Sequence, residues 1–342
     1  MNSIKLLDCT LRDGGYINDW RFGEKGIAEM TEKLCSTNVD IFEIGFLKKE
    51  PYDTNRTVFN DVDQITPLIT PKKSGVQYAA MIEVVNPLPL EQLKPCDGKG
   101  IDIIRVIVWK TKYVDGMVVD ALEEGFAYCK GVVEKGYKLC VQPARVDQYS
   151  DEEFVAMVRR FSSLDPLAIY VVDSWGTQNP EQLLHYMHLA DENMPCGIAM
   201  GYHGHNNMMQ ALSAAQQMIH EGFDRDIIVD ASVYGIGRGA GNLNLEIIAK
   251  YMNEACGKTY DIEPMVDVFD DYIKYIYEKC PWGYSLPFFL TAQYNCNPNY
   301  ASYYGHEKKM DAIRIYVALT KLTDEERIIF KKNTADKAAA EE

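Results

Sequence analysis

The sequence predicts an α/β fold, a (β/α)8 TIM barrel followed by a C-terminal helical extension. Eight short apolar runs recur along residues 4–231, and each run is nearly continuous rather than alternating with polar residues. Continuous runs are typical of parallel strands that are covered on both faces. Amphipathic segments separate the runs, and the 342 residues exceed the roughly 250 residues of an ordinary barrel.

The predicted strands and helices alternate along the chain. The strands are expected at residues 4–8, 39–46, 76–81, 101–108, 138–142, 168–173, 197–203 and 227–231. The amphipathic segments 23–36, 120–134, 151–161, 180–193 and 207–221 are each long enough for a crossover helix. Polar residues stand at or beside many strand ends, namely Asp8, Glu43, Gln142, Asp173, His203, His205 and Asp230. Since the carboxyl ends of barrel strands meet at one rim, we expect these side chains to share a site.

An open, doubly wound sheet is the main alternative fold. That fold usually carries a glycine-rich phosphate turn after its first strand, but residues 12–16 include an arginine and an aspartate. The glycine cluster at 235–242 has a spacing similar to GxGxxG, yet it follows the eighth run. We interpret it as a tight loop that leads into a helix at 243–253.

Three regions are expected along the chain. Residues 1–262 form the catalytic barrel, residues 263–330 form a helical region rich in aromatic side chains, and residues 331–342 form a disordered tail. An aromatic stripe at helical spacing is more often core or an interface than a cofactor site. The aromatic content of the second region therefore favours a homodimer.

The composition argues against several kinds of partner. A net charge of −15 argues against binding to nucleic acid or to anionic membranes. No stretch approaches the roughly 20 apolar residues of a membrane span, and the first residues lack the pattern of a signal peptide. The nine cysteines are scattered without a CxxC pair, as expected for reduced thiols. We therefore expect a cytoplasmic protein that acts on a small molecule.

His203 and His205 are the most informative pair in the chain. Alternate residues of a strand point to the same side, so both imidazoles are expected to project into one space. With the carboxylate of Asp13 they suit Mn, Co, Zn or Fe, and also Mg if water and substrate oxygens complete the coordination. The alternative for an isolated HxH is a pair of structural histidines bonded to neighbouring carbonyl groups.

Four segments together resemble the signature motifs of the DRE-TIM metallolyases, the HMGL-like superfamily. They are DCTLRDG at 8–14, FEIG at 42–45, HGHN at 203–206 and GRGAGNL at 237–243, in that order. Within the superfamily the chain is most similar to the 4-hydroxy-2-oxovalerate aldolases. Residues 172–174 and 229–232 contribute to that similarity.

The resemblance implies a reaction and a set of roles. The reaction would cleave a 4-hydroxy-2-oxo acid to pyruvate and an aldehyde. A divalent metal, manganese first and cobalt, magnesium or zinc otherwise, would be bound by Asp13, His203, His205 and Asn242. Arg12 resembles the family arginine that stabilises an enolate oxygen, and Tyr300 resembles a C-terminal tyrosine near the substrate. In bacterial aldolases the C-terminal region can dock an acylating aldehyde dehydrogenase, which is the partner that the resemblance suggests.

Elementary chemistry is consistent with these roles. A 2-oxo acid chelates a divalent ion through its keto and carboxylate oxygens, and the ion polarises the carbonyl group. Cleavage next to that carbonyl leaves an enolate, whose charge the guanidinium of Arg12 would stabilise. Glu43 would orient Arg12 or bind a metal-bound water, or else form a buried pair with Arg105. Strand-end residues expected to bind the substrate are Arg105, Gln142 and Ser174.

The expected base departs from the family pattern. Classical 4-hydroxy-2-oxovalerate aldolases carry a histidine shortly after the RDG motif, whereas this chain has Tyr16. The loop at 234–242 also lacks the cysteine that the lyase group uses. A proton must leave the substrate alcohol, so Tyr16, a metal-bound hydroxide or another rim residue is expected to take it. Two other functions stay open, an acyl-CoA-dependent lyase or condensing enzyme and a noncatalytic barrel that binds a metabolite.

Overall fold

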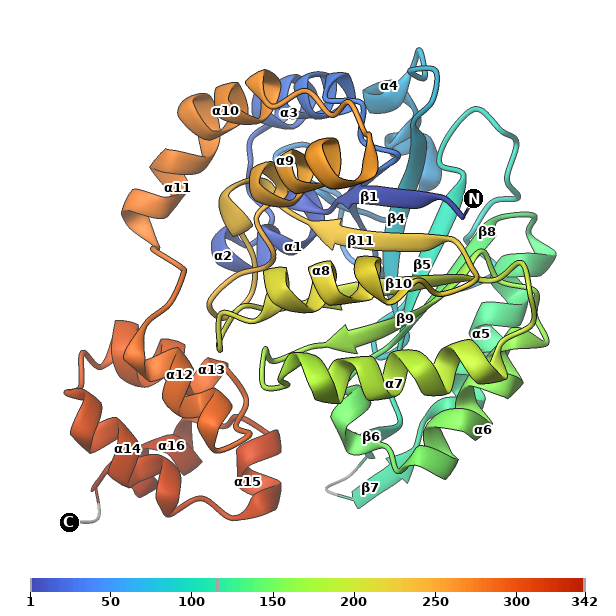
Figure 1. Cartoon of the computed structure of the whole chain (residues 1–342). Helices are drawn as coiled ribbons and strands as arrows, with labels where there is room; N and C mark the ends of the chain where they lie inside the picture. Colours follow the sequence, from blue (N-terminus) through green and yellow to red (C-terminus); the bar gives the residue numbers. More distant parts are fainter. Residues whose placement is uncertain (1, 115–116, 341–342) are drawn as a thin grey trace.

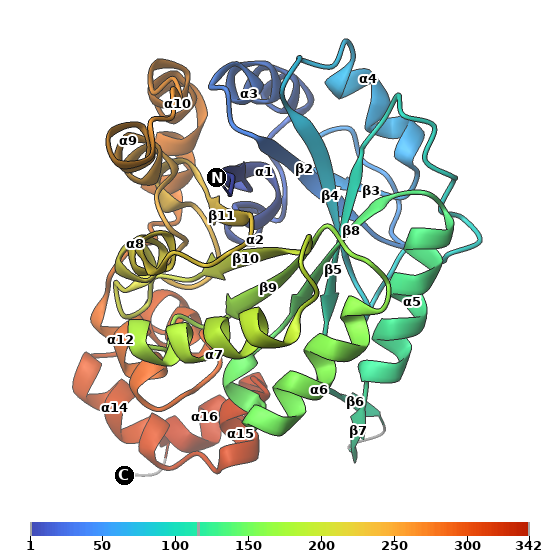
Figure 2. The ribbon, with the colours of Figure 1, turned by 45° about the vertical axis from the view of Figure 1, so that its right-hand side comes forward.

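Eight parallel strands form a closed barrel, which confirms the predicted fold (Figure 1, Figure 2). The computed structural model describes residues 2–114 and 117–340. The barrel strands are β1 (Ile4–Asp8), β2 (Ile41–Leu47), β4 (Gln77–Glu83), β5 (Ile103–Val108), β8 (Lys138–Pro143), β9 (Ala168–Asp173), β10 (Ala199–Gly204) and β11 (Ile227–Ala231). They pair in chain order, and β1 pairs with both β2 and β11, so the sheet closes on itself.

Three short strands lie outside the barrel and were not predicted. The strand β3 (Val58–Phe59) pairs with the end of β2, and β6 (Thr111–Val114) and β7 (Met117–Asp120) form an antiparallel hairpin. The sequence does not reveal this hairpin because its second strand is largely exposed, with Met117 at 65 % exposure. A strand without a buried face has no alternating apolar pattern to reveal it.

Helices cover the outside of the barrel (Figure 2). The long ones are α3 (Glu24–Ser36), α5 (Leu122–Glu134), α6 (Asp151–Ser162), α7 (Pro180–Asn193), α8 (Ala211–Glu221) and α9 (Leu245–Cys256). Short ones are α1 (Thr10–Asp13), α2 (Gly15–Asn18), η1 (Val62–Gln64), α4 (Thr66–Ile69), η2 (Val146–Gln148) and η3 (Val233–Gly235). Each predicted crossover segment contains one of the long helices.

The helix α6 shows why these segments become helices. Ser150 accepts a hydrogen bond from the backbone N–H of Glu153, whose side chain accepts one from the backbone of Ser150, which closes a capping box. Phe154, Val158 and Phe161 recur at helical spacing and are buried against the barrel. The connection from β4 to β5, at residues 84–102, is instead built from turns and loops.

The inward side of the barrel has an apolar layer below a polar one. Ile41, Ile103 and Ile228 belong to a buried cluster inside the sheet, together with Cys9 and Cys140. Side chains two residues further along the same strands point to the same side. These are Glu43, Arg105 and Asp230, and all three are buried. Strand periodicity thus brings charged groups together just below the carboxyl-terminal rim.

The C-terminal region has two parts. The helices α10 (Glu263–Val268), η4 (Phe269–Ile273) and α11 (Lys274–Lys279) form one rod, and α10 packs on the barrel helix α3. The remaining helices have a core of their own and lie near the carboxyl-terminal side of the barrel (Figure 1). They are α12 (Leu286–Gln293), α13 (Asn299–Ala301), η5 (Ser302–Glu307), α14 (Ala312–Thr320), α15 (Asp324–Ile328) and α16 (Lys332–Ala340).

The predicted disordered tail, residues 331–342, is wrong for most of its length. The helix α16 occupies Lys332–Ala340, and residues 341–342 lie outside the described part of the chain. Ala335 is fully buried, and its backbone oxygen accepts a hydrogen bond from the hydroxyl of Tyr304 at 2.8 Å. Alanine favours helices, and its small side chain lets α16 pack closely against α14. Among the described helices, none is long and apolar enough to cross a membrane.

Candidate active site

A cavity opens at the carboxyl ends of the barrel strands. Arg12, Asp13 and both histidines of the HxH pair line it. The full lining is Arg12, Asp13, Tyr16, Met81, Glu83, Ile107, Trp109, Gln142, Ala144, Val172, Ser174, His203, His205 and Arg238. The structure therefore brings together residues from both ends of the barrel sequence.

The short helix α1 places Asp13 in the cavity. The carboxylate of Asp8 accepts hydrogen bonds from the backbone N–H and the hydroxyl of Thr10, at 2.9 and 2.5 Å, and so turns the chain at the end of β1. Gly14 follows at a site without room for a side chain, since an added Cβ would lie 2.4 Å from the oxygen of Thr10. The DCTLRDG segment thus folds into a tight turn that holds Asp13 at 0 % exposure.

The two histidines converge on Asp13, as strand periodicity predicts. The Nε2 atoms of His203 and His205 lie 3.1 and 3.9 Å from Oδ2 of Asp13. The Nδ1 atom of each ring also has a hydrogen-bond partner. Nδ1 of His203 contacts Oδ2 of Asp230 at 3.0 Å, and Nδ1 of His205 donates to the backbone oxygen of Arg238 at 3.0 Å. Metal-binding histidines are usually oriented in this manner.

Burial and nearby charges set the protonation states of this group. Burial lowers the pKa of His205 to about 4, so the ring is neutral at pH 7 and Nε2 has a free lone pair. Although burial alone would raise it, Arg12 and the two histidines hold the pKa of Asp13 well below its ordinary value. Burial opposes protonation of His203, but its contacts with Asp13 and Asp230 raise its pKa overall.

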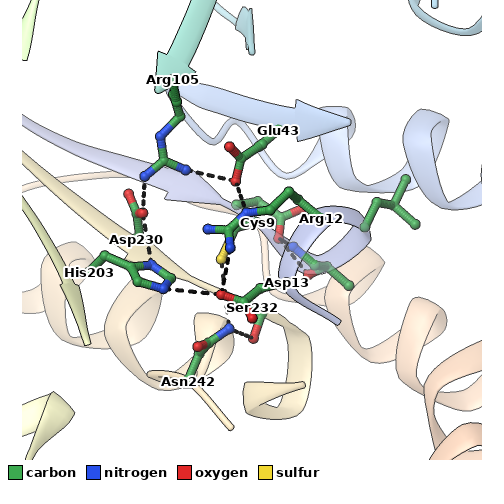
Figure 3. A network of polar contacts seen from close by, with 12 residues as sticks. Cys9, Arg12, Asp13, Glu43, Arg105, His203, Asp230, Ser232 and Asn242 are labelled. Atoms are coloured by element: carbon green, nitrogen blue, oxygen red, sulfur yellow. Dashed lines mark hydrogen bonds and ion pairs between the residues drawn. The ribbon is translucent and has the colours of Figure 1, made fainter. Parts of the chain in front are cut away.

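A chain of buried ion pairs supports the site from below (Figure 3). Nε of Arg12 donates to Oε2 of Glu43 at 2.7 Å, and Nη1 of Arg12 donates to Asp13 at 2.8 Å. Arg105 pairs with the same oxygen of Glu43 at 2.7 Å and also with Asp230. Two guanidinium groups therefore face three carboxylates. The surplus negative charge favours a cation next to Asp13.

The donor set fits a divalent metal ion. Nδ2 of Asn242 donates to the backbone oxygen of Ile236 at 3.1 Å, while its Oδ1 is buried and has no hydrogen-bond partner among the described residues. A carboxylate and two imidazoles suit a borderline ion, whereas Asn242 does not line the cavity. Sγ of Cys9 also lies with ligand atoms of Asp13 and His203 in one cluster, within 4.8 Å of one another. Cys9 was not predicted, because nothing in the sequence distinguishes it from the other scattered cysteines.

Three further predicted residues line the cavity, Tyr16, Gln142 and Ser174. Nε2 of Gln142 is buried with no partner in residues 2–114 and 117–340, so it is available to a ligand. The ring of Tyr16 packs edge-on against Trp20 and is 37 % exposed. Its phenol group nevertheless lies in a crowded setting, where desolvation and the carboxylate of Glu83 raise its pKa. Tyr16 therefore stays protonated at pH 7 and is a hydrogen-bond donor rather than a base.

Four predicted site residues do not line the cavity, namely Glu43, Arg105, Asn242 and Tyr300. Arg105 has 0 % exposure and does not line the cavity, because its charge is already bound by Glu43 and Asp230. It supports the site instead of contacting substrate, which corrects the prediction. Tyr300 is also fully buried, and its hydroxyl donates to the backbone oxygen of Glu326 at 2.7 Å within the C-terminal helices. The aromatic residues there pack on one another, so Tyr300 does not reach the cavity.

Among the lining residues that were not predicted, three have polar groups in their side chains, namely Glu83, Trp109 and Arg238. Glu83 is the last residue of β4, but the predicted strand ended at residue 81. Trp109 follows β5 and donates to Oε1 of Glu83 at 3.2 Å. Arg238 stands within a glycine-rich loop that was interpreted only as a tight turn. A correct end for β4 would have placed Glu83 on the rim with the other strand-end residues.

Comparisons with known proteins find relatives that match most of the chain. The chain is 24 % identical to a 4-hydroxy-2-oxovalerate aldolase of Bacillus cereus, over 78 % of this chain and 75 % of that protein. It is 23 % identical to an oxaloacetate decarboxylase of Mycobacterium tuberculosis, over 71 % of this chain and 68 % of that protein.

The fold also occurs in an N-terminal domain from Bacteroides vulgatus that is assigned to an aldolase. That structure has a TM-score of 0.70 and 22 % identity, with 89 % of this chain and 98 % of that chain covered. Residues 3–270 match the HMGL-like family. The matched region therefore includes α10 and ends within η4. The chain therefore belongs to the HMGL-like family.

Proposed function

We propose that the protein is a carbon–carbon lyase, a divalent-metal-dependent aldolase that cleaves a 4-hydroxy-2-oxo acid to pyruvate and an aldehyde. The observation that carries the proposal is the convergence of Asp13, His203 and His205 beside Arg12 in one cavity. The relatives named as aldolases and the family membership support the same reaction class.

Asp13, His203, His205 and Asn242 would hold the metal, with manganese as the first candidate and cobalt, magnesium or zinc as others. A bound divalent ion would act as a Lewis acid on the keto oxygen of the substrate. The chain itself supplies the remaining contacts. Gln142 and Ser174 line the same wall of strand ends and are proposed to bind the substrate carboxylate.

Arg12 is proposed to stabilise the enolate that forms during cleavage. Its Nε and Nη1 are engaged by Glu43 and Asp13, which fixes the guanidinium plane at the cavity wall. A preorganised cation at this place stabilises charge that develops on the keto oxygen. Glu43 thus orients Arg12, one of the roles expected from the sequence, and also pairs with Arg105.

Glu83 is proposed as the base, in place of the histidine of classical aldolases. It lines the cavity with Tyr16, and within the described chain no lysine, arginine or histidine forms an ion pair with it. Glu83 would take the proton of the 4-hydroxyl group while the bond between C3 and C4 breaks. C4 becomes the aldehyde carbon, the bonding electrons enter the enolate, and a proton added at C3 gives pyruvate. Tyr16 would donate a hydrogen bond to the reacting oxygen.

The proposal is tested with purified full-length protein. After loading with Mn²⁺ it should release pyruvate from 4-hydroxy-2-oxovalerate or a longer analogue, as measured by coupling to lactate dehydrogenase. Treatment with a chelator should abolish the release, and added Mn²⁺ should restore it. Oxaloacetate belongs in the substrate panel, because one relative is named as its decarboxylase and both reactions leave an enolate. Absence of turnover across the panel would refute the proposal.

The substitution Asp230→Asn is expected to weaken metal affinity by about 10–100-fold. Asp230 holds Nδ1 of His203 at 3.0 Å, and an amide in its place would orient the ring less firmly. The measurement is a Mn²⁺ titration followed by calorimetry. Asp226→Asn is a matched control, since Asp226 precedes the other end of β11 and pairs with Lys5 at the surface. Unchanged affinity in Asp230→Asn would contradict this role of Asp230.

A further inference from the structure

A second and larger cavity adjoins the first. It lies between the rim of the barrel and the C-terminal helices, and its volume is about 1050 Å³ when the part open to solvent is counted. Tyr16, Glu83 and Arg238 line both cavities, so the two spaces share a wall. The outer wall of the second cavity includes Phe288, Asn299 and Ser302 from α12, α13 and η5. A substrate that begins at Arg12 and extends outward would therefore enter this space.

Arg238 lies where the two cavities meet. Its backbone oxygen accepts the hydrogen bond of His205, and its backbone N–H donates to Oδ1 of Asp13 at 3.4 Å. Its side chain extends toward the C-terminal helices, where Nη2 donates to Oδ1 of Asn297 at 3.2 Å. The main chain of Arg238 thus contacts the residues of the first cavity, and its half-buried side chain lines the second cavity.

The charge of Arg238 is not neutralised by a carboxylate in the part of the chain that the structure describes. By contrast, Arg12 and Arg105 of the site, and Arg145 nearby, each form an ion pair with an aspartate or a glutamate. Burying a guanidinium partly from water without a carboxylate has a cost in free energy, which a bound anion would offset. In a protein with a net charge of −15, such a cation is a specific feature of the cavity.

The size of the second cavity and the polar residues in its lining also favour a larger substrate with a polar group. An aldehyde of only two carbon atoms would leave most of the larger space without a contact to the substrate. Asn299 and Ser302 add side chains that can donate hydrogen bonds. Glu307 also lines the space, but Lys332 pairs with it at 2.8 Å, which reduces its repulsion of an anion.

We propose that the second cavity binds the aldehyde half of the substrate and that Arg238 binds an anionic group, a carboxylate or a phosphate, which this half carries. This inference rests on the proposed aldolase function and adds the substrate class. The substrate is then a 4-hydroxy-2-oxo acid with a second, distal anion. Arg238 would then select substrates that carry the distal anion. Asp13, His203 and Arg12 would act on the 2-oxo acid group, which all of these substrates share.

The test compares pairs of 2-oxo acids that differ only in the distal group. Full-length protein loaded with Mn²⁺ is titrated with 2-oxoadipate against 2-oxohexanoate, and with 2-oxopimelate against 2-oxoheptanoate, by calorimetry. We expect about 10–100-fold tighter binding of the dicarboxylate in at least one pair, as for a hydrogen bond to a charged group. In Arg238→Gln the preference should fall to nearly one. Arg238→Lys should keep part of it, because the charge remains but the paired donors are lost.

Controls separate this inference from the proposed function. Arg314→Gln changes an exposed arginine on α14 that lines neither cavity, and its preference should match that of the unmodified protein. If pyruvate itself fails to bind the loaded protein, the proposed function fails. If pyruvate binds but both members of each pair bind equally well, the distal anion site alone is refuted. Because this comparison uses the unmodified protein, it holds even if an Arg238 variant does not fold.

Condensation assays then distinguish the two sources of the anion. Pyruvate is offered with succinic semialdehyde or glyceraldehyde 3-phosphate, and with the neutral partners butanal and glyceraldehyde. A higher kcat/KM for either anionic aldehyde than for its neutral partner supports the proposal and identifies the carboxylate or the phosphate. Faster reaction of both neutral aldehydes would overturn it.

Discussion

Asp13→Asn is expected to lower kcat/KM for the cleavage of a 4-hydroxy-2-oxo acid by about 10³-fold or more. The loss corresponds to the several kcal/mol that a bound divalent ion contributes to the transition state. Oδ2 of Asp13 is the atom on which both imidazoles and Arg12 converge, at 3.1, 3.9 and 2.8 Å. An amide in its place removes the negative charge that the ion requires. Pyruvate release with excess Mn²⁺ and a Mn²⁺ titration are the two measurements.

The same variant is expected to stay folded. Replacing Asp13 reduces the carboxylates of the buried chain from three to two, which equals the two guanidinium groups of Arg12 and Arg105. A balanced set is less costly to bury than one with a surplus charge. The thermal midpoint should therefore lie close to that of Asp63→Asn, a control at an exposed site that pairs with Lys94. Full activity of Asp13→Asn would contradict the proposed metal site.

Glu83→Gln is expected to lower kcat for cleavage by about 10²–10⁴-fold, the usual contribution of a general base. The amide keeps the shape of the side chain and accepts the hydrogen bond from Trp109, but it cannot take a proton. Metal affinity and pyruvate affinity should change little, because Glu83 is not one of the proposed metal ligands. The measurements are steady-state kinetics and calorimetric titrations with Mn²⁺ and pyruvate.

Two further variants make the assignment of Glu83 decisive. Glu91→Gln is the matched control, since Glu91 is exposed on the same connection from β4 to β5. Tyr16→Phe tests the other residue at this wall. The raised pKa of Tyr16 keeps its proton in place at pH 7, so its loss should cost less than the loss of Glu83. A larger loss in Tyr16→Phe than in Glu83→Gln would assign the proton transfer to the phenol.

The barrel could be predicted because its strands carry their own signal. The runs at β1, β9 and β11 were located at the same residues in the sequence and in the structure, since strands covered on both faces are apolar throughout. The convergence of His203 and His205 also follows from a local rule, the two-residue period of a strand. Their partner Asp13 required the family motif, because its position depends on the turn that Asp8 and Thr10 form.

The remaining features depend on contacts between distant segments. Arg105 was expected to meet substrate, but its distance from Glu43 and Asp230 is set by the closure of the barrel rather than by any local pattern. Tyr300 was expected at the cavity, but the aromatic residues of the C-terminal helices have a core of their own. The pairing of Arg238 with the second cavity could not be predicted either, because that space exists only where the C-terminal helices meet the rim.

The structure of the Mn²⁺-loaded protein with oxalate tests the central claim most directly. Oxalate has two adjacent oxygens, as the enolate of pyruvate does. The account predicts one ion bound by Asp13, His203 and His205, with oxalate in the cavity between that ion and the guanidinium of Arg12. An ion held by other residues, or oxalate bound away from Arg12, would contradict it.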